Sequence, residues 1–245
     1  MSKRVGFVLF ALVCTAEIAS AADAPDPSSG FLSDYSLLKP SGAGQVGKFI
    51  YIAPNATETF VAYSSMMVDQ PAFALAPDSK LKSIKPDDAK IIVDAFRQVI
   101  TDELAKGYKI VDTAGKGVLG LRTSFSHVYV QKKGRGILGY TPVGFVVTTA
   151  KGALVDDVLD KVKLAETTLE AELVDSESGN VLVAVQDHLG NRADKKELTS
   201  WKEANDELNV WAQRLNCNLA NARVALASRK DCTTIVAPVP EEKKQ

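Results

Sequence analysis

The sequence predicts an α+β fold: a mainly antiparallel sheet with two or three helices packed on one face, as a two-layer sandwich. Segments with the alternating pattern of strands come in hairpins and do not alternate one by one with helices, as they would in a parallel α/β fold. Long apolar stripes at helical spacing occur in two segments, 86–107 and 200–226. With 245 residues, the chain is long enough for one domain around a single core.

Short strands are expected where β-forming residues cluster. The run at 48–52 is the first, and a second strand lies between Tyr63 and Leu75, where Pro71 favours a position at the sheet edge. A third short strand is expected at 109–112.

The first long helix is expected to begin at Pro86. Proline fits the first helical position, and Asp87 and Asp88 complement the positive end of the helix dipole. Gly107, preceded by a cationic residue, is a typical helix stop. The apolar stripe that would face the core contains Ile91, Ile92, Ala95, Phe96, Val99 and Leu104.

A long strand is expected at 118–130, because its side chains alternate between apolar and polar. One face of this strand would be buried and the other would face water. The apolar set is Leu119, Leu121, Phe125, His127 and Tyr129, and the polar set is Gly120, Arg122, Ser124 and Ser126.

Two further strands predict a hairpin. Residues 167–175 alternate, with Glu170 and Glu172 on the side facing water. A turn leads to 180–187, whose apolar residues lie on both faces, which is typical of a central strand.

The last helix is expected to begin with a capping box formed by Ser200 and Glu203. After it, residues 231–245 would form a flexible charged tail. The apolar residues of this last helix recur every three or four positions: Trp201, Ala204, Leu208, Trp211, Leu215, Ala222 and Leu226.

Residues 1–21 are predicted to be a signal peptide. Lys3 and Arg4 precede an apolar run that ends at Val13, and a small-residue motif at 19–21 follows. The run is too short to cross a bilayer, which needs about 20 residues. Cleavage near Ala21 would give a periplasmic protein.

An outer-membrane lipoprotein is the alternative, because Cys14 follows the apolar run directly. A lipidated cysteine normally follows a small residue, whereas Val13 stands here.

Residues 22–29 form a predicted linker, and 30–230 a single α+β domain that opens with an apolar segment. Five side chains of this segment are too apolar to stay in water, since burying each is worth about 1.5–3 kcal/mol. We expect them to dock on the domain's own surface, with contact to a partner or a membrane as the alternative. They are Phe31, Leu32, Tyr35, Leu37 and Leu38.

Cys217 and Cys232 are the two cysteines that would remain after signal cleavage. In an oxidising compartment such a pair is a disulfide candidate. The bond would close a loop of about 15 residues and add about 3 kcal/mol in the chain-entropy model. Two unpaired thiols are the alternative.

Residues 131–163 form a connection longer than an ordinary hairpin loop. The segment begins with basic residues and passes through an apolar, glycine-containing run into a short amphipathic helix that reaches Val162. It would pack as a third helix, or it would contact a partner or a membrane surface. The candidate contact residues are Ile137, Leu138, Tyr140 and Phe145.

We predict no catalytic residue, no cofactor and no metal. Two G-x-G-x-x-G matches begin at Gly115 and Gly134, but neither leads from a strand into a helix, so these glycines are interpreted as turn residues. His127 shares the apolar face of its strand and His188 ends another, without a ligand-spaced cluster beside either. No G-x-S-x-G motif of a serine hydrolase occurs.

The charge balance gives no basis for a nucleic-acid partner. The formal net charge is -1, and loss of two cations and one anion with the signal peptide lowers it to -2.

Several motifs resemble the bacterial envelope proteins grouped as domain-of-unknown-function family 3313. The run SGFLSDYSLLKP at 29–40 resembles the opening of the family, and more motifs follow in the expected order. The resemblance implies no known activity. Many family members look like lipoproteins with a cysteine at the mature start, where this chain has Ala22. The further motifs are 78–82, 94–97, 106–108, 170–176 with Gly179, and the surroundings of Trp201 and Trp211.

Three functions stay open. The first is an exported, non-enzymatic envelope protein that works through contacts with envelope proteins or by self-association. The second is a periplasmic protein that binds a small ligand or a lipid. The third is a hydrolase with scattered catalytic residues.

Overall fold

The computed structural model describes residues 25, 28–54, 56–77, 85–130, 162–163, 167–189 and 201–236. The predicted signal peptide, residues 131–161 and the end of the predicted tail lie outside this part of the chain. Among the described residues, no helix combines the length and apolar character needed to cross a membrane.

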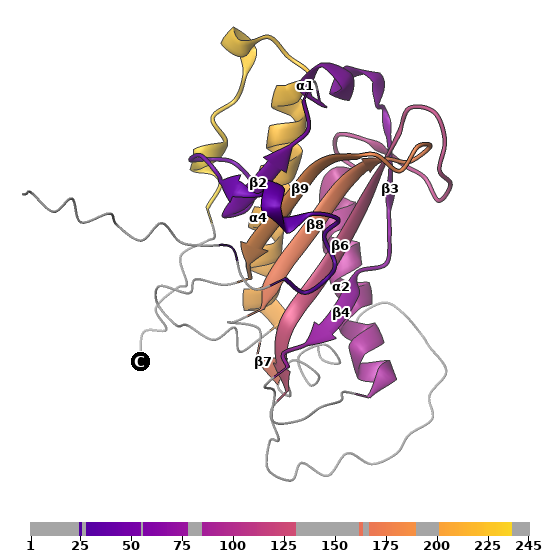
Figure 1. Cartoon of the computed structure of the whole chain (residues 1–245), viewed down its shortest axis with the longest axis vertical. Coiled ribbons are helices and arrows are strands. Elements are labelled where there is room, and N and C mark those ends of the chain that lie inside the picture. The colour runs from indigo at the N-terminus through magenta and orange to yellow at the C-terminus, as the bar shows by residue number, and fades with distance from the viewer. Residues whose placement is uncertain are drawn as a thin grey trace, which may run out of the picture.

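Within the described residues, nine strands form one mixed sheet (Figure 1). The strand order is β1-β2-β9-β8-β6-β3-β5, and β4 and β7 also pair with β6. The hairpin of β8 and β9 is as predicted, and β9 has a neighbour on each side, as expected of a central strand. The strands are β1 (Lys39–Pro40), β2 (Phe49–Ile52), β3 (Ser65–Val68), β4 (Ala72–Leu75), β5 (Lys109–Ile110), β6 (Val118–Val130), β7 (Val162–Lys163), β8 (Thr168–Asp175) and β9 (Val181–His188).

The prediction of a mainly antiparallel sheet is confirmed, although the sheet also contains parallel pairs. Along the spatial order β1-β2-β9-β8-β6, each strand is antiparallel to its neighbour. In contrast, β3 and β4 run parallel to β6, and β5 runs parallel to β3. A long helix lies between β4 and β5 in the chain, and such a crossover connection is what parallel strands require. The single strand expected around Pro71 is divided there into β3 and β4.

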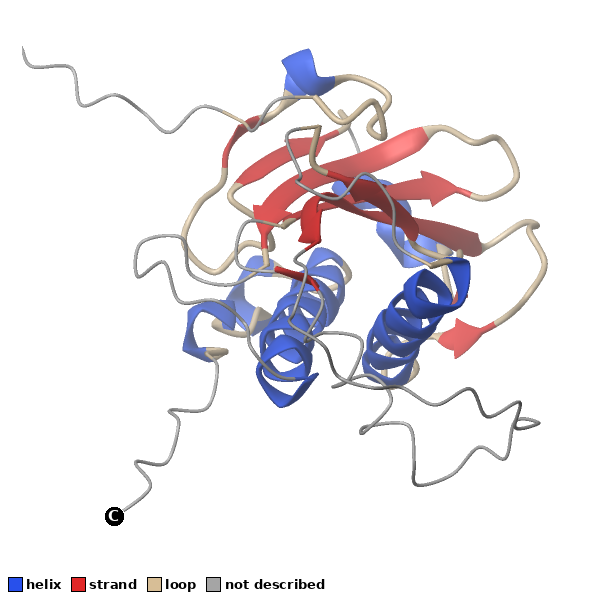
Figure 2. Ribbon diagram, turned by 90° about the horizontal axis from the view of Figure 1, so that it is seen from below, coloured by secondary structure: helices blue, strands red, loops and turns tan. Residues whose placement is uncertain are grey.

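Two long helices, α2 (Pro86–Leu104) and α4 (Trp201–Ala222), lie together on one face of the sheet (Figure 2). With the sheet, they confirm the predicted α+β class. A short helix α1 (Ala56–Thr59) leads into the 3₁₀ helix η2 (Phe60–Ala62). The other 3₁₀ helices are η1 (Tyr35–Leu37), η3 (Leu226–Ser228) and η4 (Cys232–Thr234).

The start of α2 is as predicted, with Pro86 at the amino end and two aspartates in the first turn. The helix ends at Leu104, before Gly107. Gly107 allows α4 to approach, since a Cβ atom there would lie 2.6 Å from Oδ1 of Asn216. The buried apolar residues of α2 are Ile92, Val93, Phe96, Val99, Ile100 and Leu104.

The end of α4 corrects the predicted stripe. The helix stops at Ala222, and Leu226 lies in η3 with 78% of its surface exposed. The chain turns back here because both polar atoms of the Asn221 side chain bind the backbone of Lys230, each at 2.8 Å. Val162, predicted in an amphipathic helix, lies in β7 and pairs with β6.

Strict alternation in β6 fails at His127, whose φ is 56°, a left-handed conformation that is uncommon for a residue other than glycine. Pairing with β4 shifts from Phe73 opposite Phe125 to Leu75 opposite Val128. Phe125 and Val128 therefore both enter the core. The prediction that His127 continues the apolar face is wrong, because the irregularity displaces it from the alternating series.

Phe125 of β6 meets Phe96 of α2 in the middle of the core. Both side chains have 0% of their surface exposed, and their ring centroids are 4.4 Å apart. This pair joins the sheet to its helical layer.

Phe125→Ala is expected to lower the free energy of unfolding by about 3–5 kcal/mol, because it leaves a cavity between α2 and β6. Urea unfolding with an unchanged m-value would measure this. The control is Val61→Ala, at a side chain that is 65% exposed, for which a change below about 0.5 kcal/mol is expected. Equal losses in both variants would contradict the central role of the aromatic pair.

Candidate functional site

An open pocket of about 340 Å³ lies between β2, α4, the loop 43–46 and the C-terminal segment 229–233. We call it the disulfide pocket. In Figure 1 its elements lie at the edge of the sheet formed by β1 and β2, where the yellow C-terminal segment runs beside α4.

The C-terminal wall of the disulfide pocket is fixed to α4. A disulfide joins Cys217 of α4 to Cys232, with 6.0 Å between their Cα atoms. The backbone of Lys230 is bound by Asn221, as described above. Oδ1 of Asp231 accepts a hydrogen bond from the Thr233 N–H at 2.9 Å and so caps η4. Residues 231–233, predicted as part of a flexible tail, thus form a wall of the pocket.

The loop 43–46 forms an adjoining wall, whose backbone approaches both α4 and the C-terminal wall closely. Nδ2 of Asn218 in α4 donates to the carbonyl oxygen of Gly44 at 2.9 Å. Gly44 has a φ of 76°, and a Cβ atom there would lie 2.8 Å from Cγ2 of Thr233. This position therefore needs glycine for both its conformation and its space.

The floor of the disulfide pocket is apolar, whereas its rim carries two cations. Ile52 stands at the mouth with 42% of its surface exposed, and Arg229 and Lys230 are exposed on the C-terminal wall. The floor contains the buried side chains Phe60, Leu173, Val183, Leu215 and Leu219.

Exposed apolar side chains gather around this end of the molecule. Arg223, after α4, donates to the carbonyl oxygen of Tyr63, after η2, so these two chain segments are neighbours. Figure 1 shows η3 and α1 at the same end. Four large apolar side chains are exposed on these segments and at the end of β2, and we call this set the apolar end: Ile52 (42% exposed), Val61 (65%), Val224 (42%) and Leu226 (78%).

A second cavity, of about 400 Å³, lies between the end of β9 and α4. Asp187 and His188 line it from β9, and Trp211 and Arg214 line it from α4. Burial raises the pKa of the Asp187 carboxyl group, whose Oδ1 accepts a hydrogen bond from the His188 N–H at 2.8 Å. Arg214 donates twice to the carbonyl oxygen of Ile235, at 3.0 and 2.8 Å. No serine or cysteine lines this cavity among the described residues.

Metal binding finds no support in the described ranges, where no three His, Cys, Asp or Glu side chains are placed to hold an ion. His127 and His188, the two histidines of the chain, lie on β6 and β9. The glycines at 115–117 form a turn that leads into β6.

Glu170 corrects the prediction of a water-facing side on β8, because its surface is 0% exposed. Oε2 accepts from Ser29 Oγ at 2.5 Å and from Ser126 Oγ at 3.1 Å. Oε1 accepts from the Tyr35 hydroxyl at 2.8 Å and from Gln186 Nε2 at 3.5 Å. This carboxyl group therefore holds the N-terminal segment to the centre of the sheet.

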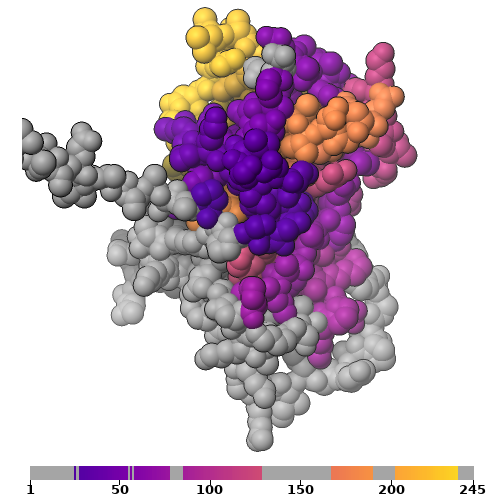
Figure 3. All heavy atoms as spheres, viewed as in Figure 1, coloured from indigo at the N-terminus to yellow at the C-terminus, as the bar shows by residue number. Residues whose placement is uncertain are grey.

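Glu172, two residues along β8, is likewise buried, at 2% exposed. Its Oε1 accepts from the Ser33 N–H at 2.6 Å. Figure 3 shows the N-terminal residues, in indigo, covering this face of the sheet. Since α2 and α4 cover the opposite face, neither face of the central strands is open to water.

The predicted contact residues of the N-terminal segment differ in how far their side chains are buried. Leu32 and Leu38 are 4% and 8% exposed and pack with Phe49 of β2 and Ala184 of β9. Phe31 and Tyr35 pack partly against the same cluster, and Leu37 is 41% exposed. Of the other predicted contacts, Ile137, Leu138, Tyr140 and Phe145 lie outside the described residues.

Comparison with protein families identifies the chain. The model of the DUF3313 family, described as a protein of unknown function, matches residues 27–215. The chain therefore belongs to this family, which confirms the predicted resemblance. No curated protein matches the sequence.

Solved structures show only distant similarity. One is a putative neuraminyllactose-binding hemagglutinin homolog from Helicobacter pylori, with a TM-score of 0.32 and 10% identity over 64% of this chain and 81% of that chain. Another is a DUF4136 family protein from Bacteroides thetaiotaomicron, with a TM-score of 0.31 and 14% identity over 71% and 96%. A PDZ domain protein from Parabacteroides distasonis has a TM-score of 0.27 and 15% identity over 59% and 31%.

Tyr35→Phe is expected to lower the free energy of unfolding by about 1–3 kcal/mol, because buried Glu170 loses a donor. The hydroxyl also accepts from the backbone N–H groups of Phe31 and Leu32, at 3.1 and 3.2 Å. Urea unfolding measures the loss. The matched control is Ser36→Ala, which removes a hydroxyl that donates to the exposed Asp34 at 2.6 Å. A Tyr35→Phe variant as stable as this control would show that the contact with Glu170 does not hold the segment.

A titration of Tyr63 tests its contact with the turn after β8. Burial, then the 2.8 Å hydrogen bond to Asp175 and the charge of Asp175, raise the pKa of Tyr63 to about 12. Ultraviolet difference absorbance against Tyr63→Phe should show this value, and Asp175→Asn should lower it while keeping it above the usual value of about 10.

The same pKa shift has a defined effect on stability. The contribution of Tyr63 is complete below the unfolded pKa of about 10 and is lost as the pH rises through about 12. Glu177→Gln, at an exposed position in the same turn, is the control and should leave the titration unchanged. An unaltered titration in Asp175→Asn would contradict the contact.

Proposed function

We propose that this chain is an exported protein of the bacterial envelope that acts by binding another protein, without enzymatic activity. The observation that carries the proposal is the apolar end, where four large apolar side chains stay exposed beside an open pocket. Scattered exposed apolar residues are ordinary, but a group of them at one place is typical of an interaction surface.

Two features support export. Residues 1–21 have the charged start, the apolar run and the small-residue motif of a signal peptide. The disulfide between Cys217 and Cys232 suits an oxidising compartment such as the periplasm. Attachment to the outer membrane through Cys14 is the variant of this proposal that the sequence also allows.

The buried carboxylates support a binding role over catalysis. Glu170 and Glu172 accept hydrogen bonds from the chain's own N-terminal segment, so they hold structure and face no substrate. In the second cavity, the side chains of Asp187 and Arg214 likewise bind backbone groups of the protein, those of His188 and Ile235. A hydrolase stays the third hypothesis, and we name no residue for it.

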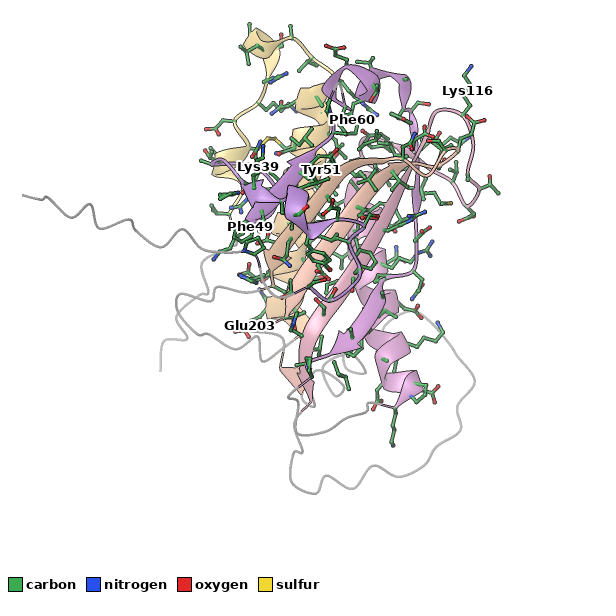
Figure 4. All side chains as sticks on the ribbon, in the orientation of Figure 1. Lys39, Phe49, Tyr51, Phe60, Lys116 and Glu203 are labelled. Atoms are coloured by element: carbon green, nitrogen blue, oxygen red, sulfur yellow. A yellow bond between two sulfur atoms is a disulfide. The ribbon has the colours of Figure 1, made fainter. Side chains whose placement is uncertain are left out.

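Photo-crosslinking in the native host tests the proposal. With p-benzoylphenylalanine in place of Leu226, or in place of Val61, we expect a covalent adduct with an envelope protein. Lys90, with a side chain 67% exposed near the start of α2, is the matched control, because α2 begins at the opposite end of the molecule from Phe60 (Figure 4). The purified protein should begin at Ala22 by amino-terminal mass.

Other outcomes would overturn parts of the proposal. No adduct above the Lys90 background would contradict a contact at the apolar end. Adducts only between copies of the chain, with dimers in sedimentation velocity, would replace the envelope partner by self-association. A retained Met1 would contradict export, and a lipid on Cys14 would place the protein on the outer membrane.

A further inference from the structure

The disulfide pocket has an apolar floor and one charged wall. Its floor is formed by buried apolar side chains from the sheet, η2 and α4, and its volume of about 340 Å³ lies within the range of ligand sites, which is about 300–1,000 Å³. The charged groups stand only on the C-terminal wall, at residues 229–231.

The two cations on this wall are available to a ligand. Arg229 and Lys230 are exposed, and no ion pair with either occurs in the part of the chain that the structure describes. The neighbouring Asp231 stays ionised, because the Thr233 hydroxyl and N–H bind its Oδ1 at 2.6 and 2.9 Å and lower its pKa, so two cations and one anion leave this wall with a net positive charge. The wall therefore presents positive charge beside an apolar floor.

Each amide side chain of the pocket uses one or both of its polar atoms to bind the protein's own backbone. Asn218 binds the Gly44 carbonyl, Asn221 binds both backbone groups of Lys230, and Oε1 of Gln45 accepts from the Gly42 N–H at 2.8 Å. A peptide in the pocket would need partners for its backbone groups. These walls favour a ligand whose polar atoms are confined to one charged end.

We infer that the disulfide pocket binds a single-chain anionic amphiphile of the fatty-acid type, with its apolar chain on the floor and its carboxylate at Arg229 and Lys230. The inference deepens the binding role proposed above and uses residues outside the apolar end, except for Ile52 at the shared mouth. The disulfide holds the cationic wall in place before the ligand arrives, which reduces the entropy lost on binding.

Binding of cis-parinaric acid, followed by its fluorescence, tests the inference on protein purified after expression of the full chain. Palmitate should displace the probe, whereas hexadecanol, which has a similar chain but no charge, should not. Arg229→Gln combined with Lys230→Gln should weaken binding by about tenfold or more, as expected for loss of hydrogen bonds to a charged group.

The matched control is Lys109→Gln combined with Lys116→Gln, which removes the same charge from exposed positions at β5 and the turn before β6. Its affinity for the probe should equal that of the unmodified protein. Thermal unfolding of both double variants should show that they fold equally well.

Three results would overturn the inference: no fluorescence increase, equal displacement by hexadecanol, or equal weakening in the control variant. Sedimentation with phosphatidylglycerol vesicles that depends on Arg229 and Lys230, without binding of free cis-parinaric acid, would assign these cations to a membrane surface instead. Crosslinking at Leu226 that persists after such a result would leave the proposed protein contact standing, so the two failures are distinguishable.

Discussion

Burial of Glu170 in the middle of the sheet is the constraint on which the outer face depends. A carboxyl group removed from water needs hydrogen-bond donors, because an unsatisfied one destabilises the fold. The neighbouring strands supply Ser126 and Gln186, and the N-terminal segment supplies the shorter contacts from Ser29 and Tyr35. The segment is therefore an integral part of the domain, and Leu32 and Leu38 add apolar burial to the same attachment.

The parts of the fold that could be predicted from the sequence are those with local signals. Pro86 with two aspartates predicts the start of α2. The spacing of apolar residues along α4 predicts its buried side as far as Asn221, where the chain turns back. The displacement of His127 in β6 has no comparable signal, because the alternating sequence continues through it. The parallel pairing of β3, β4 and β5 could not be predicted either, since it depends on where α2 returns the chain.

The covered outer face and the walls of the disulfide pocket could not be predicted for a different reason. Polarity along β8 shows which residues share a face, but not that a segment 141 residues away in the sequence covers it. The Asn218–Gly44 contact joins residues separated by 174 positions. Of the contacts that hold the pocket walls, only the disulfide between Cys217 and Cys232 could be predicted, because two cysteines occur at a spacing that a short loop can close.

The strand order also dictates when the N-terminus can fold. β2 pairs on one side with β9, and the segment before β1 binds β8, so residues 29–52 lack these native partners until the chain has been made beyond His188. Contacts so far apart in sequence form slowly. A growing chain of this kind keeps its beginning unfolded for most of its synthesis, which is the state required to thread a polypeptide through a narrow pore.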